Sequence, residues 1–321
     1  MSFRPAWWLA NPHLQSIIPT RLRRIDLPGR TRAIVRTRDQ DELLVEQLDT
    51  GTGPLVILLH GLGGCASSLY VTGMQSAFHQ AGYNTWAWNA RGAVRPNLRP
   101  DTYHGGRFAD VADLIDSAGQ RPVALVGFSL GAAMLINLVG RPAACPSTVK
   151  AAVAISCPFG FVKNAAHLDG PSTWLYRRYL LGRLRRMTQR KRNWAVSQGL
   201  DWARRLPDDA ELARLTRFAD FDDRITAPLN GFADATDLYR QVDPDQVVSA
   251  IQTPTLVVQA DDDPLFTAPL EPTGIRPKSL TLELTSGGGH VGFVQGRWPW
   301  SAEFYAQTRA LEFVHAQMER T

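Results

Sequence analysis

The stretch PVALVGFSLGAAM, residues 122–134, joins a β-branched apolar run to an alanine- and leucine-rich run through a serine flanked by two glycines. The first run favours a strand, and a helix is expected to begin at Leu130. A serine between two glycines at such a strand-to-helix turn is the pattern of a nucleophile elbow. A serine that merely caps the helix would leave Gly131 without a role. We therefore expect Ser129 to be a nucleophile.

A serine hydroxyl becomes a nucleophile when a base takes its proton, and the base needs an acid to orient it. His290 is the candidate base, because it follows three glycines in TSGGGHVGF, after the last expected strand. The candidate acid is Asp263 of QADDDPLF, which follows the expected strand TPTLVVQ. Asp261 and Asp262 are expected to form a solvated acidic turn. The chain order serine, aspartate, histidine is the one found with this type of elbow.

Acyl transfer also requires an oxyanion hole. One backbone N–H is expected from Leu130, the residue after the candidate nucleophile, at the start of a helix. The second is expected from Leu62 in HGLGG, because the glycines of that loop let backbone N–H groups face a cleft. The sequence thus offers four pieces of an acyl-transfer site, each at the carboxyl end of an expected strand.

The rest of the chain alternates expected strands with expected helices. A hairpin is expected at RAIVRTRDQDELLVEQLD, further strands at PLVILLHG, NTWAWNARG, KAAVAISCP and SLTLELT, and a closing helix at SAEFYAQTRALEFVHAQM. Such alternation predicts an α/β fold with a mostly parallel, doubly wound sheet. From about 160 to 248 the sequence is helical instead. We interpret this block as a helical cap inserted into a single domain of residues 1–321.

Hydrophobic residues make up 44% and charged residues 20% of the 321-residue chain, whose net charge is +5. This composition is typical of a globular protein, and no apolar run approaches the roughly 18 residues of a membrane-spanning helix. The start, MSFRPAWWLANPHLQ, lacks the pattern of a signal peptide. Cys65, Cys145 and Cys157 lack the spacing of disulfide or zinc sites, which favours a reducing, cytoplasmic location. We expect neither a cofactor nor a metal.

Residues 177–192, RRYLLGRLRRMTQRKR, contain eight Arg or Lys residues and no acidic residue. We favour a solvated helix face for this run. The alternative is a peripheral contact with anionic lipid headgroups or with an acidic substrate. Nucleic acid is the weakest interpretation, because no known binding module accompanies the run. We therefore expect no nucleic-acid partner.

Together these motifs resemble the α/β hydrolases, and more closely their YheT-like subfamily, which includes eukaryotic abhydrolase-domain esterases and lipases. GFSLGA, DDDPLF and GGGHVGF resemble the three stations of the family's triad, with Asp263 in the acid position, and HGLGGCASSLY is similar to its oxyanion segment. NPHLQSIIPT is similar to the subfamily's N-terminal signature, and FDDRITAPLNGFADATDLY to a segment of its cap. Ala90 and Ala93 depart from residues frequent in the subfamily, and both are expected near the pocket wall.

The resemblance implies a serine carboxylesterase that hydrolyses short- to medium-chain esters through an acyl-enzyme intermediate. Two enzymatic alternatives use the same residues: an acyltransferase with an alcohol as acceptor, and a lipase. A non-catalytic binding module is the third alternative. Such a module is expected to have lost at least one triad residue, and all three are present.

Further motifs are given structural interpretations. His13 in WWLANPHL is expected to form a structural hydrogen bond, while its neighbouring tryptophans pack against the domain. Asp222, Asp223 and Arg224 are expected to form an ion-pair and capping cluster that holds the cap to the core. Tyr103 either lines the cleft or fixes its own loop.

Overall fold

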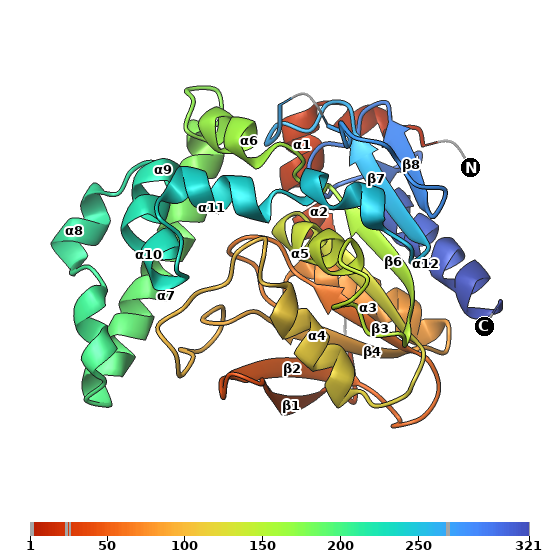
Figure 1. Cartoon of the computed structure of the whole chain (residues 1–321). Helices are drawn as coiled ribbons and strands as arrows, with labels where there is room; N and C mark the ends of the chain where they lie inside the picture. The colour runs from red at the N-terminus through yellow and green to blue at the C-terminus, as the bar shows by residue number, and fades with distance from the viewer. Residues whose placement is uncertain (1–2, 23–24, 26, 268–269, 321) are drawn as a thin grey trace.

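A computed structural model of the chain describes residues 3–22, 25, 27–267 and 270–320. Its main sheet consists of β1 (Thr31–Arg36), β2 (Glu42–Leu48), β3 (Leu55–Leu59), β4 (Asn84–Asn89), β5 (Val123–Phe128), β6 (Val149–Ile155), β7 (Thr255–Ala260) and β8 (Leu280–Thr285). The strand order is β1-β2-β4-β3-β5-β6-β7-β8 (Figure 1). Neighbours from β4 to β8 are parallel, whereas β1 pairs with β2 and β2 with β4 antiparallel. The predicted α/β fold with a mostly parallel sheet is confirmed.

The first two strands form the predicted hairpin. Their residue pairs run from Thr31 opposite Gln47 to Arg36 opposite Glu42, and the turn includes Gln40 at a φ of 67°. Residues with positive φ are common in tight turns between paired strands. Because β2 also pairs with β4, the hairpin extends one edge of the sheet.

Helices cover both faces of the sheet, as a doubly wound arrangement requires. Strands β3, β5 and β7 are buried along their whole length, which explains the uninterrupted apolar sequences of β3 and β5 and the mostly apolar one of β7. Because successive side chains of a strand point to opposite faces, alternate residues of β3 belong to two different core clusters. One cluster includes α4 (Phe108–Ser117) and α5 (Leu130–Val139), and the other includes α3 (Leu69–Gln80) and α12 (Tyr305–Met318).

The predicted cap corresponds to a helical block between β6 and β7. Its elements are α6 (Phe161–Leu168), α7 (Trp174–Ser197), η2 (Asp201–Arg205), α8 (Asp209–Arg214), α9 (Phe218–Phe221), η3 (Asp222–Thr226), α10 (Ala227–Leu229), α11 (Ala235–Val242), η4 (Pro244–Gln246) and η5 (Val248–Ala250). Figure 1 shows α7 to α11 gathered on one side of the molecule, apart from the sheet. The boundaries 160–248 and the division into a single domain with this insertion stay predictions.

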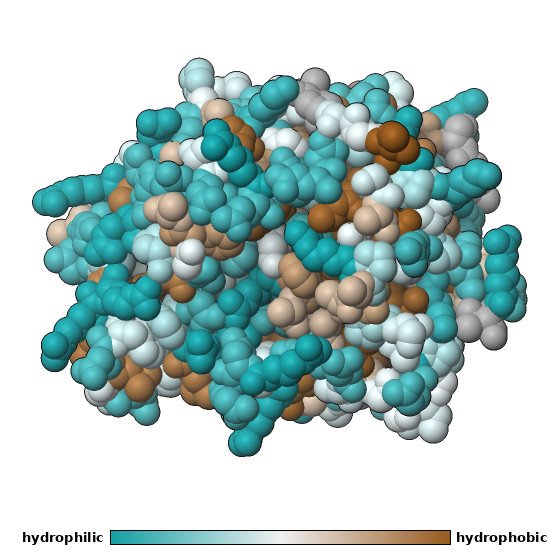
Figure 2. All heavy atoms as spheres, viewed as in Figure 1, coloured by the Kyte–Doolittle hydropathy of each residue, from teal (hydrophilic) through white to brown (hydrophobic). Residues whose placement is uncertain are grey.

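The cap has an apolar interior of its own. Leucine and phenylalanine side chains of α7, α8 and α9 pack together there, among them Leu181, Leu212 and Phe221. On the outside, the face of the molecule in Figure 2 is mostly hydrophilic, with hydrophobic side chains scattered over it. Within the described ranges, every helix is too short or too polar to cross a bilayer.

Two short stretches near the ends of the chain position the site. At the N-terminus, η1 (Trp7–Leu9) is followed by α1 (Pro12–Ile17) and α2 (Pro19–Leu22). Asn11 caps α1 by accepting hydrogen bonds from two backbone N–H groups, and a proline opens the helix. This N-cap and proline explain why NPHLQ starts a helix.

The closing helix is shorter than predicted. It begins at Tyr305, and the residues before it form η6 (Pro299–Ser301) and β10 (Glu303–Phe304). The last of these pairs with β9 (Val294–Gln295), which lies just after the glycine-rich segment of His290. The pairing of β10 with β9 keeps residues 303–304 out of the helix that was expected from residue 301. A two-residue strand is too short to show a period in the sequence, so it could not be predicted.

Candidate active site

Ser129 occupies a strained turn between β5 and α5. Its backbone lies at φ 52° and ψ −119°, a region that side-chain-bearing residues rarely adopt. A Cβ on Gly127 would lie 2.5 Å from the Gly131 carbonyl oxygen, and one on Gly131 would overlap the Leu59 carbonyl oxygen. Both glycines are therefore required by close backbone contacts, and the turn has the geometry expected of a nucleophile elbow.

The structure brings Ser129, His290 and Asp263 into one chain of hydrogen bonds. The His290 Nε2 atom lies 3.0 Å from the Ser129 Oγ atom, and the Nδ1 atom lies 2.7 Å from Asp263 Oδ2. Because a carboxylate can only accept, the proton of the neutral imidazole belongs on Nδ1. Nε2 is then free to accept the serine proton, which is the geometry that nucleophilic catalysis needs.

The three neighbouring aspartates have different partners. Asp263 faces the imidazole and is 6% exposed. Asp261 accepts a hydrogen bond from the Gly287 N–H at 2.7 Å, and Asp262 accepts one from the Gly289 N–H at 2.8 Å. Asp261 is exposed and Asp262 is partly exposed, so the pair forms a solvated acidic turn as expected. Their carboxylates also hold the glycine-rich segment that carries the histidine, which was not expected.

Helix α1 supports the same segment from the other side. The His290 N–H donates to Ser16 Oγ at 2.8 Å. The Gln15 side chain is fully buried, and its amide both donates to the Val294 carbonyl and accepts from the Val294 N–H, each at 2.9 Å. Ser16 thus fixes the backbone at His290, and its neighbour Gln15 fixes the backbone at Val294.

The residues before and within α1 also join this end of the chain to the rest of the molecule. Trp7 and Trp8 donate indole hydrogen bonds to the carbonyls of Arg297 and Gly296. His13 Nδ1 lies 2.9 Å from the Tyr176 hydroxyl of α7, and the two rings stack. Trp8 packs against the domain and His13 forms a structural hydrogen bond, as predicted, whereas Trp7 is largely exposed.

Leu62 and Leu130, the predicted oxyanion donors, both line a cavity together with Ser129. Among the described residues, neither backbone N–H has a hydrogen-bond acceptor. Leu130 is the first residue of α5, where N–H groups are unsatisfied by the helix itself. Both amides are thus available to bind an oxyanion.

Two buried tyrosines fix the HGLGG loop on either side of Leu62. The Gly61 N–H donates to the Tyr70 hydroxyl at 3.0 Å, and the Gly63 N–H donates to the Tyr103 hydroxyl at 2.7 Å. Burial raises the pKa of Tyr70 to about 12 and raises that of Tyr103 further, so both stay neutral. Tyr103 lines the cavity as well. It therefore both lines the cleft, as one of the two interpretations expected, and connects its own loop to the HGLGG loop.

Two further histidines lie close to the site. His104 lines the cavity, and its Nδ1 atom accepts a hydrogen bond from the Gly106 N–H at 3.2 Å. His60 precedes the HGLGG loop. Its Nδ1 atom lies 2.8 Å from the Gly61 carbonyl, and its Nε2 atom accepts from the Ala90 N–H at 3.1 Å. Burial lowers its pKa to about 4. Both ring nitrogens of His60 are therefore occupied, and the histidine positioned to act as a base at Ser129 is His290.

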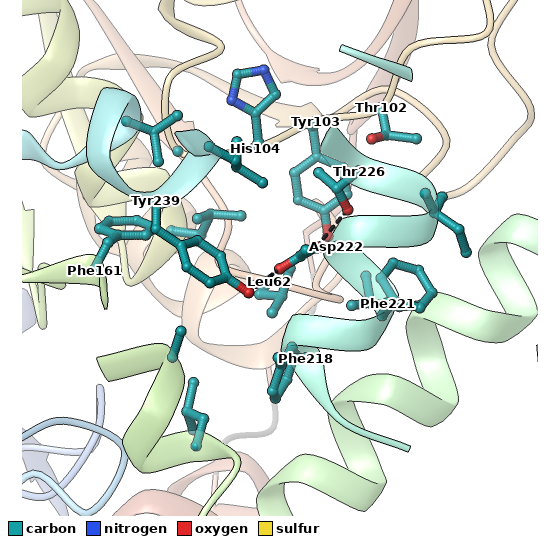
Figure 3. A pocket seen from close by; sticks show the side chains of 18 of the residues that line it. Leu62, Thr102, Tyr103, His104, Phe161, Phe218, Phe221, Asp222, Thr226 and Tyr239 are labelled. Atoms are coloured by element: carbon teal, nitrogen blue, oxygen red, sulfur yellow. Dashed lines mark hydrogen bonds between the residues drawn. The ribbon is translucent and has the colours of Figure 1, made fainter. Parts of the chain in front are cut away.

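The cavity next to Ser129 lies between the sheet and the cap. Its walls are mostly apolar, and the labelled aromatic side chains in Figure 3 surround it. Among the lining residues are Leu62, Phe161, Leu168, Leu184, Met187, Phe218, Phe221, Ile225, Leu238, Val242 and Phe266. The charged lining residues are Arg91, Lys191 and Asp222. Ala90 and Ala93, expected near the wall, instead pack in the core beneath the sheet's helices.

The cap cluster is only partly as predicted. Asp223 accepts a hydrogen bond from the Ala235 N–H at 2.6 Å, and Arg224 forms an ion pair with Glu211, so both stabilise the cap internally. Asp222, by contrast, lines the cavity. The turn η3 that carries these residues is π-helical, and its altered winding turns adjacent carboxylates in different directions.

The basic run forms part of α7, and much of it is engaged within the protein. Arg177, Arg185, Arg190, Lys191 and Arg192 donate hydrogen bonds to carbonyl or side-chain oxygens of other segments. Arg178 and Arg186 lie exposed. A contact with anionic lipid through this run stays a prediction.

The described residues contain no group of three or more His, Cys, Asp or Glu side chains arranged to hold a metal ion. The three cysteines are free thiols. The chemistry assembled at Ser129 needs only side chains and backbone amides.

Comparisons with known proteins agree with this geometry. The model of the α/β hydrolase fold family matches residues 54–297. The chain is 34% identical over 253 residues to the putative esterase YheT of Escherichia coli, which covers 76% of this chain and 71% of that protein. This chain is an α/β hydrolase of the YheT-like subfamily. It is also 28% identical over 282 residues to phospholipase ABHD3 of Bos taurus, covering 85% of this chain and 66% of the phospholipase.

Among solved structures, the esterase Pf2001 of Pyrococcus furiosus resembles this hydrolase with a TM-score of 0.58. The two are 16% identical, and the match covers 90% of this chain and 93% of that one. At this identity the likeness concerns the fold. It agrees with the strand order and the flanking helices described above.

Sequence reasoning gave no role at the site to Tyr70, Gln15 and Ser16, and it left two alternatives open for Tyr103. Tyr70, Tyr103, Gln15 and Ser16 hold the loops that carry Leu62 and His290. The N-terminal NPHLQS motif was a signal for two of them, because it stood out before any role could be assigned. Tyr70 has no comparable signal in one sequence.

Proposed function

We propose that this α/β hydrolase is a serine carboxylesterase. The observation that carries the proposal is the hydrogen-bonded series Ser129, His290 and Asp263, with 3.0 Å and 2.7 Å between successive partners, at a mostly apolar cavity. The printed names of the relatives, a putative esterase and a phospholipase, also concern ester bonds. Together they favour ester hydrolysis at Ser129.

The proposed reaction has two halves. Ser129 Oγ attacks the ester carbonyl carbon while His290 Nε2 takes its proton, and the carbonyl oxygen becomes an oxyanion held by the Leu62 and Leu130 amides. When the C–O bond to the alcohol breaks, His290 returns the proton to the departing alkoxide. Water then attacks the acyl-enzyme with the same base, which releases the acid and restores Ser129. Asp263 keeps the imidazole in the required tautomer throughout.

We propose short- to medium-chain esters as substrates. The apolar lining of the cap cavity suits an acyl chain. A peripheral contact with anionic lipid is a further proposal, and its support is limited to the exposed arginines of α7. A cytoplasmic location is also proposed, on the basis of three free cysteines.

A serine-directed fluorophosphonate probe tests the mechanism. We expect the purified protein to be labelled on Ser129, and we expect Ser129→Ala to be unlabelled and to lose ester hydrolysis. The oxyanion hole alone leaves roughly 10³-fold catalysis over water. Ser197→Ala, at the exposed end of α7, is the matched control and should behave as wild type. A folded Ser129→Ala protein that is still labelled or still hydrolyses p-nitrophenyl butyrate at the wild-type rate contradicts the proposal.

A further inference from the structure

The cavity contains one carboxyl group that the proposed hydrolysis does not use. Asp222 lines the same cavity as Ser129, and Figure 3 shows its carboxyl group between Tyr239 and Thr226. It is the first residue of η3, the π-helical turn between α9 and α10. Turns of this kind are rare in proteins and occur frequently at functional sites. The position of Asp222 therefore calls for a role beyond packing.

The surroundings of Asp222 make it a hydrogen-bond acceptor. Thr226 Oγ1 donates to Asp222 Oδ1 at 2.5 Å, and the Tyr239 hydroxyl donates to Oδ2 at 2.6 Å. Both hydroxyl protons are thereby used, while each carboxylate oxygen keeps capacity to accept another bond. The three side chains together can accept further hydrogen bonds and have none to donate. A ligand group that meets them must be a donor.

No described Lys, Arg or His side chain forms an ion pair with Asp222. Its pKa is raised to about 6, chiefly by burial; the two hydroxyl hydrogen bonds oppose this rise, and the carboxylates of Asp169 and Asp223 add to it. A buried carboxyl group without a cationic partner is costly. Its presence in a mostly apolar cavity is explained if a ligand supplies the missing partner.

The other two charged groups of the cavity have partners of their own. Lys191 Nζ donates to Asn97 Oδ1 at 2.8 Å, and the Arg91 guanidinium pairs with a set of aspartates outside the cap. Neither cation therefore pairs with Asp222. Because the cavity walls are mostly apolar, a charged ammonium group would lose its hydration on entering, which costs more than it does for a neutral hydroxyl group. A neutral donor, and hence a hydroxyl group, fits Asp222 better than an ammonium group.

We propose that Asp222, together with Thr226 and Tyr239, binds a free hydroxyl group of the ester substrate. The inference rests on the proposed ester hydrolysis at Ser129 and narrows its substrate class to hydroxylated esters. The hydroxyl belongs either to the alcohol part, as in a partial ester of a polyol, or to the acyl chain, as in a hydroxy acid. In both kinds of ester a hydroxyl group donates a hydrogen bond to the Asp222 carboxylate.

Two matched pairs of substrates distinguish these sources. In the first pair, 1-octanoylglycerol and propyl octanoate differ only in the hydroxyls of the alcohol part. In the second, p-nitrophenyl 8-hydroxyoctanoate and p-nitrophenyl octanoate differ only in a hydroxyl on the acyl chain. For the wild-type enzyme we expect kcat/KM to favour the hydroxylated member of one pair by about tenfold or more, since a hydrogen bond to a charged group is among the stronger ones. No preference in either pair overturns the inference without any variant.

Asp222→Asn tests whether this residue causes the preference. The amide keeps the size of the side chain but loses the charge and half of the acceptor capacity, so kcat/KM for the hydroxylated ester should fall about tenfold more than kcat/KM for its unhydroxylated partner. Asp223→Asn, the exposed neighbour with the same charge change, should keep the wild-type ratio. A role in folding alone would lower the activity on both members of a pair equally, and this outcome overturns the inference.

Two other outcomes are informative. Hydrolysis of none of the four esters by folded wild-type protein overturns the proposed esterase function and this inference with it. Hydrolysis of all four with equal ratios in wild type and Asp222→Asn overturns only the inference. A preference of wild type for butyrylcholine over its uncharged analogue 3,3-dimethylbutyl butyrate, lost in Asp222→Asn, also overturns the choice of a hydroxyl over a cation.

Discussion

Replacing Asp263 with Asn tests how the proposed triad holds its proton. Asp263 Oδ2 lies 2.7 Å from His290 Nδ1, while Oδ1 accepts a hydrogen bond from the Leu265 N–H at 2.9 Å. The second bond orients the side chain, so an Asn is expected to turn its carbonyl oxygen toward Leu265 and its NH₂ group toward the imidazole. That NH₂ group only donates, so Nδ1 must accept and the ring proton moves to Nε2. Nε2 can then no longer accept the proton of Ser129.

The size of the effect follows from this change of tautomer. In a comparable serine triad the same exchange of Asp for Asn lowers kcat by about 10⁴. Here the change leaves the hydrogen bond to Leu265 in place, so the side chain keeps its position. We therefore expect a loss of about 10⁴ in kcat with a well-folded protein and with KM close to wild type.

The assay compares Asp263→Asn with Asp262→Asn on p-nitrophenyl butyrate, with circular dichroism as the check on folding. Asp262 accepts a hydrogen bond from the Gly289 N–H, and an Asn can still accept it through its carbonyl oxygen. The loss for Asp262→Asn should stay within about tenfold, because a neutral acceptor weakens such a bond only modestly. If Asp262→Asn proves the crippling change, or if Asp263→Asn retains more than about a tenth of wild-type kcat, the tautomer argument is refuted.

Three further predictions follow from the geometry. Gln15→Leu leaves the Val294 N–H and carbonyl unpaired, so kcat should fall by roughly 10² at nearly unchanged KM, in steady-state kinetics. Among the described residues, Arg91→Met leaves the fully buried Asp41 without an ion pair and removes one of the two arginine partners of Asp110, and urea denaturation should show a loss of about 3–5 kcal/mol. Comparing p-nitrophenyl esters from butyrate to palmitate should place the maximum of kcat/KM at short to medium length; a maximum at palmitate that rises at a lipid interface would indicate a lipase.

The strands and the elbow were predictable because local sequence specifies them. A run such as VALVGF is buried on both faces, and no polar residue interrupts it. The turn that follows needs glycines on both sides of Ser129, where backbone atoms of other segments leave no room for a Cβ. The short pair β9 and β10 has no such local signature, so the closing helix was expected to begin too early.

The cap shows where prediction from a single sequence ends. FDDR presents two adjacent carboxylates, and helical periodicity cannot say which of them faces inward. The π-helical winding of η3 points Asp222 into the cavity and leaves Asp223 exposed. In the basic run of α7, the sequence likewise could not say which side chains face the protein and which face solvent. Lys191 is buried within the protein while Arg186 of the same run is exposed, a difference that depends on what the helix packs against.

The two reacting side chains are held in different ways, and this explains the place of the N-terminal helix. Ser129 is fixed by the sheet itself, through the turn between β5 and α5. His290 lies on a segment beyond β8, where Val291 and Phe293 have φ values of 63° and 48°.

Residues in such conformations cost on the order of 1–3 kcal/mol each and persist only where surrounding contacts enforce them. In the His290 segment some of these contacts come from α1, through Ser16 at a separation of 274 residues along the chain, and others come from Ser156, whose Oγ accepts from the Val291 N–H at 3.0 Å. Helix α1 lies outside the range that the α/β hydrolase family model matches. The NPHLQS motif thus adds to the support of the His290 segment from outside the matched range, through Gln15 and Ser16, and neither of these residues touches the reacting atoms.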